Sequence, residues 1–377
     1  MGITKRLNLT NIFLFLYLAV FPLGQIIRIG VIHPTDIVVI CGAFYVVYKK
    51  IKKPEIFGLF QNFIFVAFGT WVFSIFIFSS VNIFYGLLYL ARLTAYFYFF
   101  VYAYNFVQKS NKNKKLIRQS LFLVTIASAI FGWIQFFTIP DIKPFFTWGW
   151  DEHLYRLVGT FLDPTFLGLI LVFGIFISLA NKKWLTAIFM IISLAFTYSR
   201  ASYLALLVGL PFVLTFKRNA KQLVIVVCAL IILVATLPTT KNHSIEIFRT
   251  FSAIARVENY KTTLNIFSKS PIFGVGYNNM CIAYQKYIGP QSFSSHACSG
   301  SDSSLLFVLA TTGILGIFSF SAMIFEILKN IYKDKLLVAM SVAIGVHSVF
   351  SNSLFYPWVL GFFMLMLATT LSNKVKN

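Results

Sequence analysis

Apolar residues run along most of the chain in stretches separated by short polar breaks. A helix of about 20 apolar residues crosses a membrane hydrocarbon core about 30 Å thick, so we read each long apolar stretch as a span. The twelve predicted spans, several of them short, lie near Asn11–Ile27, Thr35–Tyr48, Ile56–Phe78, Phe84–Phe106, Ser120–Thr138, Phe161–Ala180, Trp184–Thr197, Tyr203–Phe216, Gln222–Leu237, Ser304–Leu328, Leu336–Phe350 and Pro357–Leu371. The chain is therefore expected to be all-α, a polytopic membrane helical bundle that forms one integral membrane domain over residues 1–377.

Two segments between spans, residues 139–160 and residues 238–302, are too long to be simple turns. In Ile245–Ser268, apolar residues recur near helical spacing with charged residues between them. This pattern indicates an amphipathic helix lying on the membrane surface. Gly274 and Gly276 follow and are expected to form a tight turn. Residues 238–302 should thus be a long, partly helical extracytoplasmic loop between the ninth and tenth spans.

The composition supports this interpretation. Hydrophobic residues make up 58% of the chain and charged residues 11%, whereas a soluble domain has about 45–50% and about 25%. A soluble monomer is excluded. The net charge of +21 would suggest a nucleic-acid partner in a soluble protein, but here most basic residues fall in alternate short loops beside apolar spans. This is the positive-inside pattern, which predicts that both termini are cytoplasmic and that no nucleic acid is bound.

The remaining arginines are candidates for function. Arg92 falls close to the centre of the fourth predicted span, where a charge costs at least about 2.5–3.5 kcal/mol. It needs a partner, and a carboxylate or carbonyl on a neighbouring helix is the structural alternative to a functional role. Arg28, Arg156 and Arg200 should lie at the outer membrane boundary, where each alone could anchor a helix end. Together they suggest an anion site, because guanidinium groups match phosphate oxygens two bonds at a time.

Acid and base candidates are few on the outer side. Asp163 precedes Pro164 and either caps the sixth span or supports the site. His296 comes shortly before Asp302 at the start of the tenth span. Although a single loop histidine is usually solvated, these two side chains could reach one pocket and supply a general base for a sugar hydroxyl.

The cysteines do not predict a metal site. The chain has 4 cysteines, with no Cys-x-x-Cys and no histidine partner at zinc spacing, so neither a metal nor a cofactor is expected. Cys281 and Cys298 share the outer loop and could pair in an oxidising compartment.

A series of short motifs resembles the O-antigen ligase and polymerase family between about Arg92 and Phe318. The motifs are Gly159-Thr160-Phe161-Leu162-Asp163-Pro164, then Thr197-Tyr198-Ser199-Arg200-Ala201, then Arg256 through Tyr260 leading to Ser270-Pro271-Ile272-Phe273-Gly274-Val275-Gly276, then Leu305-Leu306 with Thr312-Gly313-Ile314-Leu315-Gly316. The resemblance implies a multi-span, metal-independent, inverting glycosyltransferase of the bacterial inner (cytoplasmic) membrane, with its active site facing outward. Such an enzyme takes a glycan from a polyprenyl diphosphate at the outer leaflet and passes it to a glycan or lipid acceptor.

The resemblance also implies roles for particular residues. The family's arginine after the serine of the short hairpin matches Arg200, and its loop arginine matches Arg256; both are associated with the donor diphosphate. Arg92 and Arg156 are further candidates for binding this diphosphate. The family's histidine is replaced here by Asp302. Either Asp302 is the base, or His296 reaches in from the loop.

Two alternatives stay open at this point. A ligase and a polymerase are not distinguished by these motifs. A transporter or flippase of lipid-linked oligosaccharide would use similar arginines to hold the diphosphate, but it predicts charges through both halves of the bilayer and related halves of the chain, whereas the charges here gather on one side and no internal repeat is found.

Overall fold

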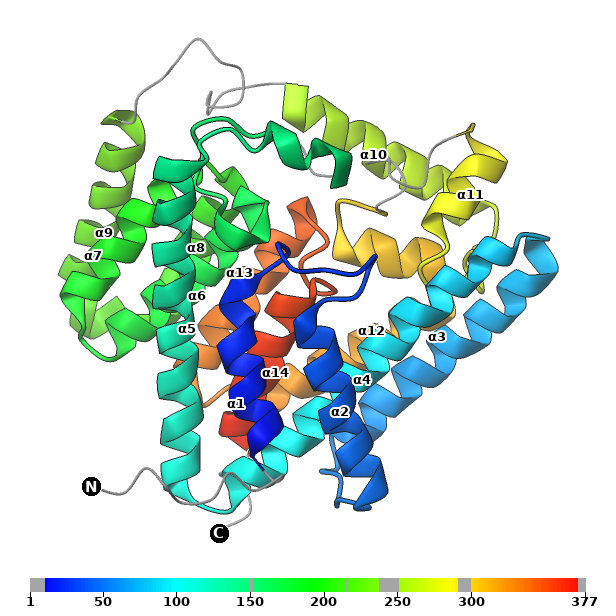
Figure 1. Cartoon of the computed structure of the whole chain (residues 1–377), viewed down its shortest axis with the longest axis horizontal. Coiled ribbons are helices and arrows are strands. Elements are labelled where there is room, and N and C mark those ends of the chain that lie inside the picture. The colour runs from blue at the N-terminus through cyan, green and yellow to red at the C-terminus, as the bar shows by residue number, and fades with distance from the viewer. Residues whose placement is uncertain (1–10, 149–151, 215, 237–250, 291–299, 372–377) are drawn as a thin grey trace.

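The computed structural model describes residues 11–148, 152–214, 216–236, 251–290 and 300–371 (Figure 1). Its helices are α1 (Ile12–Val20), α2 (Pro34–Tyr48), α3 (Phe57–Ile77), α4 (Phe84–Gln108), α5 (Asn111–Thr138), α6 (Pro164–Ala180), α7 (Trp184–Ala195), α8 (Arg200–Val213), α9 (Phe216–Thr236), α10 (Phe251–Ser268), α11 (Met280–Tyr287), α12 (Ser304–Ile331), α13 (Lys335–Phe350) and α14 (Pro357–Leu371). Short 3-10 turns lie at Phe21–Leu23, Val81–Ile83, Lys143–Trp148 and Gly159–Phe161. The all-α prediction is confirmed.

Helix lengths do not confirm the count of twelve spans. Among the residues that the structure describes, four stretches are long and apolar enough to cross a membrane: Phe57–Ile77, Val81–Gln108, Asn111–Thr138 and Ser304–Ile331. The other predicted spans appear as shorter apolar stretches of 10–17 residues, among them Val224–Thr236 within α9. At about 1.5 Å of rise per residue, a helix of 15 residues extends only about 22 Å. The first predicted span shows why: α1 ends at Val20, and a 3-10 turn containing Pro22 follows it.

The packing separates central helices from peripheral ones. The side chains of α6 and α14 are buried on nearly all sides, which is typical of helices at the centre of a bundle. The peripheral helices expose large apolar side chains, among them Phe65 at 78%, Phe76 at 83% and Phe137 at 75%. Such faces are stable only against lipid, so these helices belong to an integral membrane protein.

One end of the bundle gathers predicted cytoplasmic loops, and we call it the basic end. Arg118 near the start of α5 donates hydrogen bonds to Asp334, which caps α13, and to Thr369 and Thr370 at the end of α14. Lys53, between α2 and α3, donates to Tyr98 of α4 at 3.3 Å. α10 and α11 lie at the opposite end, at the top of Figure 1, which we call the α10 end.

Three helices begin at the α10 end with side-chain caps. Asp163 accepts the backbone N–H groups of Thr165 and Phe166 at 2.6 and 3.4 Å, so it is the N-cap of α6. Ser199 and Ser303 cap α8 and α12 in the same way. These caps satisfy backbone donors that have no partner within the helix, and they fix where each helix starts.

α12 is kinked at Gly313, where φ is +65°. The loop before α11 lies against this kink: the N–H of Val275 donates to the carbonyl of Ala310 at 3.0 Å, and the N–H of Ile314 donates to Pro271 at 2.9 Å. A Cβ on Gly313 would lie 2.2 Å from the carbonyl oxygen of Ile272. Glycine is therefore required by both the backbone conformation and the close approach.

Candidate functional site

Arg200 is the first residue of α8 and follows the tight α7–α8 turn. The turn requires a left-handed residue, Tyr198 with φ +51°. Arg156, only 3% exposed, holds this turn. Its Nε and Nη2 donate to the carbonyl of Thr197 at 2.9 and 2.8 Å, and Nη2 also donates to the carbonyl of Tyr198 at 3.2 Å. The guanidinium of Arg156 thus positions the backbone that carries Arg200.

Arg256 comes from α10, on the face that contacts the end of α13. Its guanidinium lies over the ring of Phe350, 5.9 Å from the centroid. One turn further along, the hydroxyl of Tyr260 donates to the carbonyl of Val349. Arg256 is close enough to Arg200 for their positive charges to repel each other. The structure therefore brings together the two arginines that the resemblance pairs.

Asp302 precedes α12 and lies beside the same face of α10. Its backbone N–H donates to Oδ1 of Asn259 at 2.9 Å. Burial raises the pKa of Tyr260, Arg256 opposes this change, and the negative charge of Asp302 adds to it. Arg256, Tyr260 and Asp302 therefore interact electrostatically. We call these three residues, together with Arg200, the arginine site.

His347 is a buried residue of this region that the sequence analysis missed. Its Nε2 lies 3.2 Å from the Ser202 hydroxyl and 3.2 Å from the carbonyl of Thr165, and its Nδ1 lies 2.5 Å from the hydroxyl of Ser353. Because a carbonyl only accepts, Nε2 carries the proton. His347 therefore ties the end of α13 to the starts of α6 and α8, within electrostatic range of Arg256. The sequence does contain a signal for this residue, because His347 lies inside a predicted apolar span, where an ionisable side chain is usually functional.

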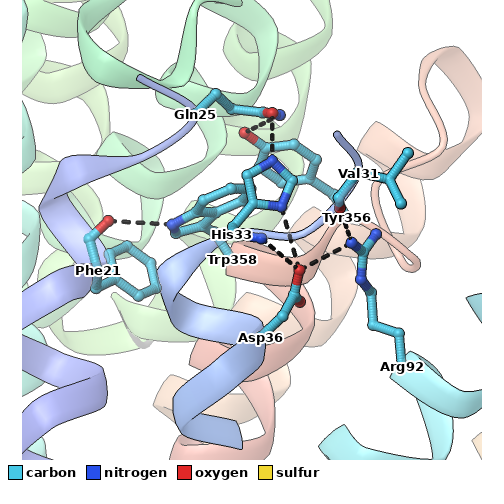
Figure 2. Close-up of polar contacts among 8 residues, drawn as sticks. All are labelled: Phe21, Gln25, Val31, His33, Asp36, Arg92, Tyr356 and Trp358. Carbon is cyan, nitrogen blue, oxygen red and sulfur yellow. Dashed lines mark hydrogen bonds and ion pairs between the residues drawn. The ribbon is translucent and has the colours of Figure 1, made fainter. Parts of the chain in front are cut away.

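Arg92 lies in a second polar network, separate from these contacts (Figure 2). Its Nη2 donates to Oδ2 of Asp36 at 2.8 Å and to the carbonyl of Val31. Asp36 is 3% exposed and also accepts the backbone N–H of His33 at 3.0 Å. The predicted need for a partner is thus met by a carboxylate on a neighbouring helix, α2.

The same network continues to the start of α14 (Figure 2). Nε2 of His33 lies 2.9 Å from Oε1 of Gln25, and Nε2 of Gln25 donates to the hydroxyl of Tyr356 at 3.3 Å. The indole N–H of Trp358 donates to the carbonyl of Phe21 at 3.1 Å. These contacts join the α1–α2 connection to α14, so the network holds sequence-distant parts of the bundle together.

Other predicted candidates have different positions. Asp163 caps α6 and is electrostatically coupled to Tyr356. His296 and Cys298 lie outside the described residues, while Cys281 is disulfide-bonded. Arg28 is half-buried near Tyr89.

An apolar groove of about 430 Å³ lies between α5 and α7. It is lined by Ile130, Trp133, Ile134, Phe137, Thr138 and Phe189. The Trp133 ring packs against Phe196, 5.0 Å between centroids, at the start of the turn that leads to Arg200. The lining suits an apolar chain and offers no charge to a phosphate.

The helical bundle with exposed apolar flanks and a charged group at one end defines an integral membrane protein. Residues 185–321 match the family model described as O-antigen ligase, so this part of the chain is similar to O-antigen ligases. The predicted resemblance is confirmed. The match runs from α7 into α12 and contains Arg200, Arg256 and Asp302. A search of curated proteins finds no match. This similarity supports a role in membrane surface-polysaccharide biosynthesis.

Proposed function

We propose that this protein transfers or polymerises a polyprenyl-diphosphate-linked glycan at the outer leaflet. The observation that carries the proposal is that α10 holds Arg256 against Phe350 at the end of α13 and Asn259 against Asp302, within electrostatic range of Arg200. All these residues but Phe350 lie in the family-matched part of the chain. An anion that carries negative charge on two linked groups stabilises two neighbouring guanidinium groups that would otherwise repel each other. A diphosphate is such an anion. Its lipid chain would keep the donor at the depth of the arginine site.

In the proposed reaction, an acceptor hydroxyl oxygen attacks the anomeric carbon of the donor sugar. The bond between that carbon and the diphosphate oxygen breaks, and the bonding electrons leave with the diphosphate. Arg200 and Arg256 stabilise the charge that develops there. Asp302, or His296 in its place, takes the proton of the acceptor hydroxyl. Attack from the face opposite the leaving group inverts the configuration of the sugar.

The contacts of the other predicted arginines favour supporting roles. Arg156 uses its guanidinium on the carbonyls of Thr197 and Tyr198, and Arg92 uses its own on Asp36. We therefore propose that Arg156 orients the turn before Arg200, that Arg92 fixes α4 to α2, and that neither is the first contact of the diphosphate. Asp163 supports the site by starting α6.

The test is transfer by purified protein in lipid nanodiscs, with a synthetic polyprenyl-diphosphate sugar and candidate acceptors. R200A and R256A should lose transfer by at least about 100-fold, the loss typical of one preorganised charge-stabilising donor, and should remain folded. K261A is the matched control, because Lys261 lies on the same helix, is exposed and pairs only with the exposed Glu258 among the described contacts. Full turnover by both arginine variants would remove them from the mechanism.

A parallel comparison assigns the base. D302N or H296A should slow transfer by about 10²–10⁴-fold, the contribution typical of general base catalysis. If neither substitution slows transfer, the assignment of the base is wrong. The flippase alternative predicts another result: wild-type protein in sealed vesicles would move the labelled donor between leaflets without forming a glycosidic bond.

A further inference from the structure

We propose that Asn259 is a positioning residue that holds Asp302 at a fixed place relative to Arg256. The proposal rests on the proposed function, in which Asp302 accepts a proton and Arg256 binds the diphosphate. The side chain of Asn259, on α10, thus links Asp302 to the helix that carries Arg256.

The Asn259 amide pairs with the backbone on both sides of Ser301. Its Oδ1 accepts the N–H of Asp302 at 2.9 Å, and its Nδ2 donates to the carbonyl of Gly300 at 3.3 Å. The Ser301 hydroxyl also donates to Oδ1 at 3.5 Å. A backbone segment held through both its donor and its acceptor has little freedom to shift or rotate, so the amide fixes where the Asp302 side chain begins.

α10 places this amide on the same face as the diphosphate-binding residue. Arg256, Asn259 and Tyr260 are spaced by three and four residues, so they are neighbours on one side of the helix. Tyr260 fastens that side to the carbonyl of Val349 at the end of α13. On the opposite side, Ile254 is 59% exposed. A single rigid helix therefore carries both Arg256 and the anchor of Asp302.

The position of Asp302 depends on Asn259 for a further reason. The cap of α12 comes from Ser303, whose hydroxyl accepts the N–H of Leu306 at 3.5 Å. That contact fixes the start of α12, but it does not hold the peptide groups before Ser303. The Asn259 amide holds these groups. A displacement of about 1 Å in a reacting group can cost about 100-fold in rate. Loss of the Asn259 amide should therefore lower kcat more than it raises KM for the donor.

N259D separates positioning from a purely structural role. Aspartate has nearly the same shape as asparagine and keeps the acceptor for the N–H of Asp302, but it loses the donor to Gly300 and adds a negative charge. Two neighbouring carboxylates raise each other's pKa. The acid limb of the kcat–pH profile should therefore move to higher pH in N259D, and kcat should fall about 10- to 100-fold in N259A.

The experiment uses the full chain in nanodiscs, the synthetic donor, and E258Q as the control on the exposed side of α10. Unchanged kcat in N259A together with a wild-type pH profile in N259D would overturn the proposal. It would also be overturned if the loss of activity in both variants merely followed the loss of folded protein in thermal unfolding. D302N with wild-type turnover would also overturn the proposal, because Asp302 would then not be the base. Failure of the proposed function gives a different result, because the wild-type protein itself would then form no product from the donor, whatever the Asn259 variants do.

Discussion

Replacing Arg156 tests how the turn before Arg200 is held. The guanidinium of Arg156 is buried and donates to the carbonyls of Thr197 and Tyr198. Methionine has a similar length and no donor, so R156M leaves both carbonyls without this partner. A hydrogen bond from a charged group contributes about 1.5–3 kcal/mol. Two such partners give an expected loss of about 3–6 kcal/mol in the free energy of unfolding.

R156K should be intermediate. An ammonium is a single point of charge and cannot place a planar set of donors on two carbonyls, so about half of the stabilisation should be lost. The assay is unfolding by denaturant in detergent micelles, followed by tryptophan fluorescence. K143M is the control from the same loop, because Lys143 is 66% exposed and lies 3.9 Å from Glu152; such a pair contributes at most about 1 kcal/mol. An R156M protein that unfolds within about 1 kcal/mol of wild type would refute the assigned role.

Three further changes have definite expected outcomes. G313A should prevent stable folding, because the new Cβ would lie 2.2 Å from the carbonyl oxygen of Ile272 at a backbone φ of +65°; a monodisperse, wild-type elution profile in detergent would contradict this. Burial alone would raise the pKa of Asp334, but Arg118 and hydrogen bonds outweigh it and hold the pKa below the ordinary 3.8. This group therefore stabilises the fold above pH 3.8, and its contribution is lost as the pH falls through the lowered value; D334N should remove this part of the acid dependence in thermal unfolding, and an unchanged acid profile would exclude it. H347F should lower the free energy of unfolding by about 1–3 kcal/mol, because it removes the hydrogen bonds of the imidazole with the Thr165 carbonyl and the Ser353 hydroxyl and each such bond contributes about 0.5–1.5 kcal/mol; equal stability to wild type in denaturant titration would show that these contacts contribute nothing.

The sequence by itself determined the class of the protein and the local features of its site. The excess of apolar residues excluded a soluble domain, and the alternation of basic loops predicts a multi-pass topology with cytoplasmic termini. Asp163 before Pro164 indicated a helix cap, and the structure confirms it. Arg200 was placed in the short hairpin between two spans, and in the structure it is the first residue of α8, directly after a tight turn. Each of these features depends on neighbouring residues, so a local pattern is sufficient to predict it.

Only the tertiary structure decided which distant groups meet. The approach of Arg200 to Arg256, the pairing of Arg92 with Asp36, and the contact of His347 with the start of α8 join residues that are far apart in the sequence. In a soluble protein, an amphipathic pattern indicates the buried face of each helix. Here lipid-facing and protein-facing sides are both apolar, and association depends on shape and on a few interhelical hydrogen bonds. The hydrophobic pattern therefore predicts that a helix forms, but it does not indicate which neighbour the helix packs against or which polar side chains that packing brings together.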